Sequence, residues 1–173
     1  MRKVLGPIFF NRPAYIVAKD LLGKYLVRKI EDEEIASMIV ETEAYEGMDD
    51  LGSHASKGRT PRTEIMFQKA GRIYIYLIYG MYHMLNIVTG KKDHPAAVLI
   101  RGVVGAMGPG RLTQKMEIGK QLNTLSLGKE TGLWIEDRGI KVNKKDIKIT
   151  PRIGVDYAGP IWSQKLWRFV LSH

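Results

Sequence analysis

The stretch RIYIYLIYGMYHMLNIVT, residues 72–89, decides how this chain folds. Two apolar, aromatic-rich runs, residues 72–79 and 81–89, lie on either side of a single glycine, Gly80. Branched and aromatic side chains favour strands, and a glycine between two such runs is typical of a tight turn. The stretch therefore predicts an antiparallel β-hairpin with its tip at residues 79–82.

A helix and two more strands are predicted before this hairpin. Pro13 at a first helical position, apolar residues at helical spacing and Gly23 as a C-terminal stop describe a short amphipathic helix. Residues 24–30 and 35–45 are rich in strand formers and meet at the polar turn 31–34. We expect these two segments to pair as antiparallel strands.

The rest of the chain predicts a long loop followed by short elements. Residues 46–71 are punctuated by glycines and lack a sustained period, which indicates a functional loop containing some helix. A strand is expected at 96–101, and a helix at 111–118 after the turn Gly108-Pro109-Gly110. Later short strands are predicted at 133–136, 140–142, 147–149 and 166–171.

This succession of elements indicates the fold class. Strands outnumber helices, and most neighbouring strands are joined by short turns, which favours a largely antiparallel sheet. We therefore expect an α+β protein: a single mixed domain over residues 1–173, with a curved sheet, short flanking helices and a protruding hairpin.

Composition excludes several classes of protein. The absence of cysteine excludes disulfides, thiolate metal sites, iron–sulfur clusters and cysteine nucleophiles. Polar residues interrupt the apolar stretch 73–90 before it reaches the roughly 20 residues that span a bilayer. Pro7 breaks the short apolar run near the start, and no signal-type cleavage site follows. We expect a cytoplasmic protein, nucleoid-associated if prokaryotic, with no membrane and no obligate protein partner.

The distribution of charge points to a polyanionic partner. The net charge is +9, yet residues 31–50 carry nine acidic groups and no lysine or arginine. The remaining 153 residues hold 27 basic and 9 acidic groups. Lysine and arginine that neutralise phosphates supply most of the sequence-independent affinity for nucleic acid. Nucleic acid is thus the first partner to test, although solubility alone could explain the same charge.

Two carboxylates share one face of a predicted strand. Alternation over residues 35–45 places four side chains together: Ile39, Glu41, Glu43 and Tyr45. A carboxylate shielded by apolar walls can act as a general base or stabilise positive charge in a transition state. An exposed strand end, or a buried ion pair with arginine, is the structural alternative.

Aromatic residues in the hairpin suggest contacts with bases. Tyr74 and Tyr76 share a face, where core packing is the simpler role for Tyr74. Tyr79 lies at the turn, where an exposed ring can wedge between base pairs, and aromatic faces stack on bases. His54 lies in the long loop beside several basic residues. The four histidines lack metal-ligand spacing, so we expect neither a metal nor a cofactor.

Ordered sequence blocks along nearly the whole chain resemble the alkyladenine DNA glycosylase family of the mammalian type, also called methylpurine or 3-methyladenine DNA glycosylases. Recognisable order extends from about Asn11 to Phe169. The blocks that carry the resemblance are residues 21–23, 40–45, 53–54, 60–62, 66–67, 74–82, 85–86, 98–101, 108–112 and 152–155.

The resemblance implies an enzyme that flips a damaged purine out of duplex DNA and hydrolyses its N-glycosidic bond, leaving an abasic site. Its substrates would be 3-methyladenine, 7-methylguanine, hypoxanthine or ethenoadenine. Glu43 matches the general base of the family, and Arg101 and the Val155 carbonyl match groups that hold the attacking water. No lysine stands at a matched nucleophile position, so a monofunctional hydrolase is expected.

The resemblance also implies which residues contact the base and the DNA. Asn86 matches the residue that disfavours guanine by crowding its amino group. The matched residues that line the base pocket are Tyr45, His54 and Tyr76. Those at the DNA surface are Tyr79, which fills the gap left in the duplex, with Met81 and Tyr82 beside it. Apart from the resemblance, Arg111 follows a glycine-rich turn that could hold a phosphate.

The sequence differs from the family pattern at two places, and two other functions are also compatible with it. Only residues 102–107 stand where many relatives have a longer insertion, and Asp156 follows Val155 where a small residue is expected. A metal-dependent nuclease could use four carboxylates as ligands: Glu41, Glu43, Asp49 and Asp50. A non-catalytic protein could instead bend duplex DNA with Tyr79.

Overall fold

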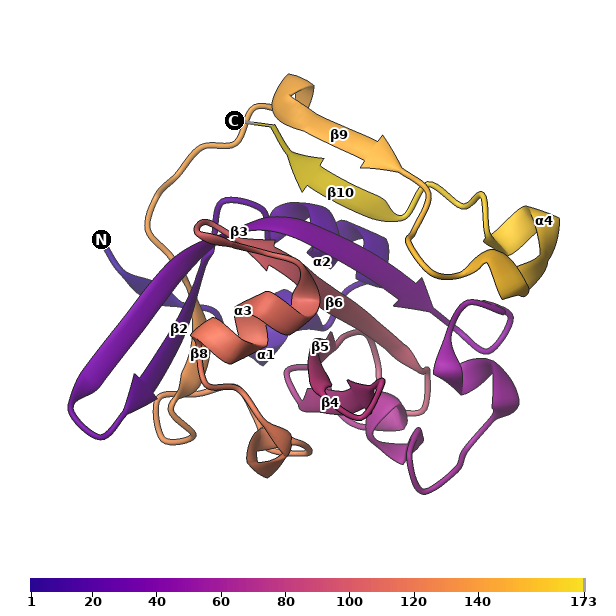
Figure 1. Ribbon diagram of the computed structural model, residues 1–173, viewed down its shortest axis with the longest axis horizontal. Coiled ribbons are helices and arrows are strands. Elements are labelled where there is room, and N and C mark those ends of the chain that lie inside the picture. Colours follow the sequence, from indigo (N-terminus) through magenta and orange to yellow (C-terminus); the bar gives the residue numbers. More distant parts are fainter. Residues whose placement is uncertain (173) are drawn as a thin grey trace.

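The computed structural model describes residues 1–172 and has an α+β fold built on one ten-stranded, antiparallel sheet (Figure 1). The main path of the sheet runs β1-β8-β2-β3-β6-β5-β4, with β7 paired to β6, and β10 paired to β3 and β9. The expected fold class is thereby confirmed. No helix in this part of the chain is long and apolar enough to cross a membrane.

The strands are β1 (Lys3–Val4), β2 (Tyr25–Ile30), β3 (Glu33–Glu46), β4 (Ile73–Ile78), β5 (Tyr82–Val88), β6 (Ala96–Val103), β7 (Ala106–Met107), β8 (Leu133–Asp137), β9 (Ile147–Thr150) and β10 (Arg168–Leu171). The α-helices are α1 (Pro7–Phe10), α2 (Ala14–Asp20), α3 (Pro109–Lys115) and α4 (Gly159–Trp162). Short 3-10 helices are η1 (His54–Lys57), η2 (Glu64–Phe67), η3 (Lys120–Leu122), η4 (Lys144–Asp146) and η5 (Asp156–Ala158).

The long strand β3 joins the two halves of the sheet. Its first half pairs with β2 and its second half with β10, while β6 runs along its other edge. The register opposite β6 is irregular on both sides of Glu41. Ile39 and Ala44 consequently both lie in the main core, although strict alternation would send them to opposite faces. The expectation that Ile39 shares a face with Glu41 is therefore wrong.

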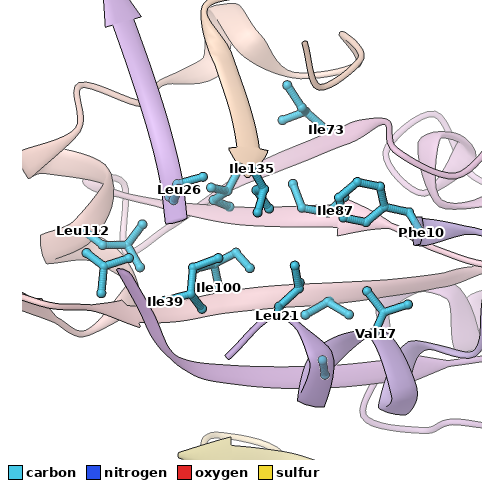
Figure 2. Packing of buried hydrophobic residues seen from close by; sticks show 14 of the residues in the cluster. Phe10, Val17, Leu21, Leu26, Ile39, Ile73, Ile87, Ile100, Leu112 and Ile135 are labelled. Atoms are coloured by element: carbon cyan, nitrogen blue, oxygen red, sulfur yellow. The ribbon is translucent and has the colours of Figure 1, made fainter. Parts of the chain in front are cut away.

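Two hydrophobic clusters cover opposite faces of the sheet. In the larger cluster, α2 packs against β3 and β6, and α3 packs against β5 and β6 (Figure 2). Neighbouring residues Ile87 and Val88 belong to different clusters, as alternation along β5 requires. The smaller cluster includes Phe67 of η2, so the segment 46–71 covers the second face of the hairpin and β6. This second face carries the site.

Several predicted elements need their bounds revised. The hairpin forms as expected from β4 and β5, with its turn at 79–81. Helix α3 begins at Pro109, inside the predicted turn, and ends at Lys115. Pro13 occupies the N-cap position of α2, one residue before the helix begins, rather than the predicted first helical position. The segment 140–142 is not a strand: a Cβ on Gly23 would lie 2.5 Å from Val142 Cγ2, so these apolar side chains pack against a helix-ending turn instead.

Candidate active site

A cavity of about 440 Å³ opens on the second face of the sheet. Six segments of the chain supply its walls: the end of β3, the loop 46–71, the hairpin, β6, the start of α3 at Pro109 and the segment 153–157. Predicted site residues that line it are Tyr45, His54, Tyr76, Tyr79, Asn86, Arg101 and Val155. The fold thus brings most of the predicted site together around one hollow.

Glu43 lies directly behind this cavity and is completely buried. Its Oε2 accepts a hydrogen bond from the Tyr45 hydroxyl at 2.8 Å, and its Oε1 accepts one from the Ile153 backbone N–H at 2.7 Å. Arg101 Nε is 3.6 Å from the same Oε1. Glu43 does not line the cavity itself, but all three of these neighbours do. The carboxylate is therefore in contact with groups that line the cavity.

Burial raises the pKa of Glu43 above its ordinary value, because desolvation disfavours the charged carboxylate. The positive charge of Arg101, the Ile153 N–H and the Tyr45 hydroxyl act in the opposite direction. These neighbours stabilise the carboxylate without overcoming the cost of burial. Glu43 therefore has the raised basicity that suits a general base.

Arg101 is shared between two glutamates. Its Nε donates to Glu41 Oε1 at 3.0 Å, closer than its 3.6 Å approach to Glu43. The same Glu41 oxygen also accepts a hydrogen bond from Arg168 Nε of β10 at 2.7 Å. The predicted face is thus real for these two carboxylates, and Glu41 is the one that holds the arginines.

A fully buried ion pair fixes the segment that meets Glu43. Arg152 donates to the two carboxylate oxygens of Asp50 at 2.6 and 2.8 Å, and both side chains are completely buried. Arg152 also donates to the Ala44 carbonyl and stacks 4.7 Å from the Tyr45 ring. These contacts place the Ile153 N–H against Glu43. This pair, whose members are 102 residues apart, was not predicted from the sequence.

Aromatic side chains form the opposite wall. The ring centroids of His54 and Tyr76 are 4.6 Å apart, edge to face, and those of Tyr74 and Tyr76 are 5.2 Å apart. Burial, together with Arg62 and Lys57, lowers the pKa of His54 to about 4, so its imidazole is neutral at neutral pH. His54 Nδ1 lies 2.9 Å from the Tyr74 hydroxyl. The rings of this wall are therefore uncharged, and the Arg62 guanidinium lies over the Tyr76 ring, 5.2 Å from its centroid.

The phenols of this wall remain protonated. Burial, reinforced by the nearby Glu43 carboxylate, raises the pKa of Tyr45 and of Tyr76. The Tyr45 hydroxyl is accordingly a hydrogen-bond donor to Glu43. Tyr45 thus has two contacts with the site, a ring at the cavity wall and a donor to the carboxylate.

Asn86 presents a fixed amide to the cavity. Its Nδ2 donates to the backbone carbonyls of Tyr74 at 3.3 Å and Met84 at 3.2 Å. The amide nitrogen is thereby committed to the hairpin backbone, which leaves the side-chain oxygen as the group able to meet a bound molecule. This geometry makes Asn86 a rigid part of the wall.

Val155 and its neighbours form one side of the cavity. Val155 is buried and lines the cavity, and its carbonyl accepts a hydrogen bond from the Ala158 N–H at 2.9 Å. A carbonyl oxygen can accept a second hydrogen bond, so the role of this group in holding water stays a prediction. The polar group of this segment that contacts Glu43 is the Ile153 N–H, which was not predicted from the sequence. Asp156 is exposed at the start of η5.

The hairpin tip projects beside the mouth of the cavity. Tyr79 is 88% exposed and has a left-handed backbone conformation, with φ of 50°. Met81 is also exposed, whereas Tyr82 is half-buried against α3. A Cβ on Gly110 would lie 2.5 Å from the Tyr82 ring, so this close approach requires glycine. Arg111 follows on the exposed side of α3.

The four carboxylates proposed as ligands for a nuclease metal are not gathered for that purpose. Arginines already bind Glu41 and Asp50, and Asp49 is exposed. Within residues 1–172, no group of three or more acidic, histidine or cysteine side chains is arranged to hold a metal ion. The nuclease alternative therefore finds no support in the geometry of these groups.

Comparisons with known proteins agree with this geometry. The family model of methylpurine-DNA glycosylases matches residues 8–107 and 104–173. A protein of Methanocella arvoryzae is 45% identical over 96% of this chain and 91% of its own length. Proteins of Sodalis glossinidius and Legionella pneumophila strain Paris are each 44% identical, covering 96% and 99% of this chain and 95% and 96% of their own lengths. All three carry the name "Putative 3-methyladenine DNA glycosylase".

Proposed function

Because this chain belongs to the methylpurine-DNA glycosylase family of DNA repair hydrolases, we propose that it flips damaged purines out of duplex DNA and hydrolyses their N-glycosidic bond. The product is an abasic site, formed without cleavage of the strand. Alkylated and deaminated purines are the substrate class: 3-methyladenine, 7-methylguanine, hypoxanthine and ethenoadenine. We further propose that the site works as in the mammalian alkyladenine enzymes that the sequence resembles.

The observation that carries this proposal is the position of Glu43. Its carboxylate is completely buried, burial raises its pKa, and its neighbours Tyr45 and Arg101 line a cavity with tyrosine walls. The cavity volume of about 440 Å³ lies within the range of small-ligand sites, roughly 300–1,000 Å³. A base that enters this hollow places its sugar near the Glu43 carboxylate.

Hydrolysis then needs one base and one water. Glu43 takes a proton from the water while the water oxygen bonds to the anomeric carbon of the sugar. The departing purine takes the electron pair of the broken N-glycosidic bond. The transition state resembles an oxocarbenium ion, which a nearby carboxylate stabilises. Each Glu43 oxygen has a second lone pair beyond those used by Tyr45 and Ile153, so the water can bind without breaking either bond.

The walls of the cavity account for the selection of damaged bases. The rings of Tyr45, His54 and Tyr76 provide faces and edges for stacking. Alkylated purines that carry positive charge are attracted to electron-rich tyrosine faces and leave readily. Extruding a damaged base from the duplex also costs less free energy than extruding a normal, correctly paired base. Asn86, held rigidly by the hairpin backbone, crowds the amino group of a normal guanine.

The hairpin tip and α3 form the DNA-binding surface in this proposal. An exposed ring such as Tyr79 is costly to leave in water but can fill the space that an extruded nucleotide leaves in the duplex. Met81 lies beside it at the surface, and Tyr82 supports the tip through its contact with Gly110. Arg111 supplies positive charge for a phosphate.

The test uses single-turnover release of hypoxanthine or ethenoadenine from a duplex, in the presence of EDTA. The wild-type protein leaves an abasic site and an intact strand. Glu43→Gln keeps its affinity for lesion duplex but loses about 10²–10⁴-fold in rate, the usual contribution of a general base. Glu33→Gln, which alters an exposed glutamate at the other end of the same strand, retains the wild-type rate.

Each alternative function gives a different result in the same assay. Nicking of the strand that EDTA abolishes would indicate a nuclease, and binding without release of any base would indicate an architectural protein. Full activity of Glu43→Gln would exclude Glu43 as the base. Tyr79→Ala, assayed for binding, should lose preference for lesion duplex over undamaged duplex; an unchanged preference would remove Tyr79 from the wedge role.

A further inference from the structure

Glu41 is a second buried carboxylate beside the site, and the reaction described above does not use it. We propose that Glu41 is a positioning residue: it binds Arg101 to itself and so prevents that guanidinium from closing onto Glu43 as a full ion pair. This inference rests on the proposed role of Glu43 as general base. It adds a specific function for the residue two positions before that base.

The distances around Arg101 support separate roles for Glu41 and Glu43. The Nε–H of Arg101 donates to Glu41 Oε1 at 3.0 Å, while Glu43 Oε1 lies 3.6 Å from the same nitrogen. The first distance is that of a hydrogen bond and the second is not. Both carboxylates are almost completely buried, so neither attraction is screened by water. The Nε–H group of Arg101 is therefore hydrogen-bonded to Glu41 and is not available to Glu43.

Arg168 anchors Glu41 from the neighbouring strand. Its Nε donates to Glu41 Oε1 at 2.7 Å, and its Nη1 donates to Thr150 Oγ1 of β9 at 3.1 Å. Glu41 is thus held between one arginine of β10 and one of β6. This two-sided binding fixes the Glu41 carboxylate, and a fixed carboxylate can in turn fix Arg101 at the cavity wall.

The groups around Glu43 show why the position of Arg101 matters. Those that face it or lie next to it are Glu41 and Tyr45 of β3, Arg101 of β6, Tyr76 of β4, Arg168 of β10, and Arg152 with the Ile153 N–H from the segment after β9. Arg152 is already committed to Asp50 by two hydrogen bonds. Arg101 is the arginine nearest to Glu43, so its distance controls how basic the carboxylate remains.

Removing the charge of Glu41 tests the proposal directly. Glu41→Gln retains the shape of the side chain and an oxygen acceptor, but it no longer attracts Arg101 as an anion. Arg101 then closes onto Glu43, and the acidic limb of the single-turnover pH–rate profile moves to lower pH by about one unit. The excision rate on the plateau of the pH–rate profile falls about 10- to 100-fold, because Arg101 leaves the cavity wall and Glu43 becomes a weaker general base. Binding of lesion duplex changes little.

Arg168→Gln is the matched control. It breaks the other arginine contact of Glu41 and removes one partly buried charge, but it leaves the Glu41–Arg101 bond in place. The proposal predicts that its acidic limb does not move to lower pH. A purely structural network would instead give the same change for Arg168→Gln as for Glu41→Gln, and that result would overturn the inference.

A double variant keeps the test valid if the single change at Glu41 impairs folding. Glu41→Gln with Arg168→Gln removes one negative and one positive charge, so the buried network keeps its net charge. Arg101 still lacks its anionic acceptor in this protein. Its acidic limb should therefore match the lowered position expected for Glu41→Gln, and a limb at the wild-type position would overturn the inference.

The outcome is distinguishable from failure of the proposed function. A wild-type protein that releases no base, or a fully active Glu43→Gln, would defeat the function itself. An active wild type and an inactive Glu43→Gln, together with an unmoved acidic limb in Glu41→Gln, would defeat only the inference. The carboxyl carbon of Glu43, followed by NMR during a pH titration of the free protein, gives the same comparison without any substrate.

Discussion

Two buried carboxylates only seven residues apart, Glu43 and Asp50, have opposite relations to arginine. Both side chains are completely buried. Asp50 accepts two hydrogen bonds from the Arg152 guanidinium and two more from backbone N–H groups. Glu43 accepts its bonds from a neutral phenol and a backbone amide, and its nearest arginine stays 3.6 Å away.

This difference separates structural from chemical use of the same group. When a carboxylate accepts two hydrogen bonds from one guanidinium, the positive charge of the arginine balances its negative charge. Such a pair holds segments of the chain together. A carboxylate that is buried without such a contact has its pKa raised by desolvation, as at Glu43, and remains able to accept a proton. The first carboxylate, Asp50, stabilises the wall of the site, and the second, Glu43, is the group that we propose as the general base.

The largest effect in this comparison is expected from breaking the structural pair. Asp50→Asn leaves the Arg152 guanidinium buried without a counter-charge, which should lower the free energy of unfolding by about 3–5 kcal/mol. Asp49→Asn changes the exposed neighbouring residue and should alter stability by less than about 0.5 kcal/mol. Urea denaturation of the two variants measures the difference. Equal stabilities would show that the buried pair contributes nothing beyond an exposed charge.

A smaller effect is expected from removing the phenol that bonds to Glu43. Tyr45→Phe retains the ring at the cavity wall but deletes the donor to Glu43 Oε2. The charged form of Glu43 is then less favoured, so the acidic limb of the pH–rate profile should move to higher pH by about one unit, the size expected of one hydrogen bond to a charged group.

Tyr76→Phe is the comparison for that experiment, because the ring of Tyr76 lines the same cavity while the hydroxyl bonded to Glu43 belongs to Tyr45. Its acidic limb should remain at the wild-type position, whatever happens to base binding. If Tyr45→Phe left the limb unmoved, or if both variants moved it equally, the hydroxyl of Tyr45 would have no specific effect on Glu43.

Local patterns predicted the strands that carry the site, because their signals lie within a few residues. The hairpin of β4 and β5 follows from two apolar runs around Gly80, and the shared face of Glu41 and Glu43 follows from alternation. Alternation failed for Ile39, since the irregular pairing of β3 with β6 near Glu41 changes the face. An irregular pairing depends on the partner strand and leaves no local mark in the sequence.

The parts of the site that escaped prediction come from long-range contacts. The bond from the Ile153 N–H to Glu43 is made by a backbone group, and any residue at that position carries the same group. The Asp50–Arg152 pair joins positions 102 residues apart, and nothing in either local sequence indicates the other. Residues 140–142 have strand-like composition, yet their apolar side chains find a partner at Gly23.

The smallest expected effect concerns stability rather than rate. Desolvation raises the pKa of Glu43 in the folded protein above its value of about 4.3 in the unfolded chain. The stability that neutral Glu43 contributes is therefore complete below that value and is lost as pH rises through the folded pKa. Glu43→Gln has no charge to bury, so its stability relative to wild type should increase over this pH range and then level off.

Urea midpoints of the two proteins, measured at intervals between pH 4 and pH 8, test this dependence. The same measurements on Asp50→Asn should show a large loss of stability, because this change removes the carboxylate that is bound to Arg152. A stability difference between Glu43→Gln and wild type that stayed constant with pH would mean that burial of Glu43 costs the folded protein nothing. In that case the contrast between a neutralised and a reactive carboxylate would not hold.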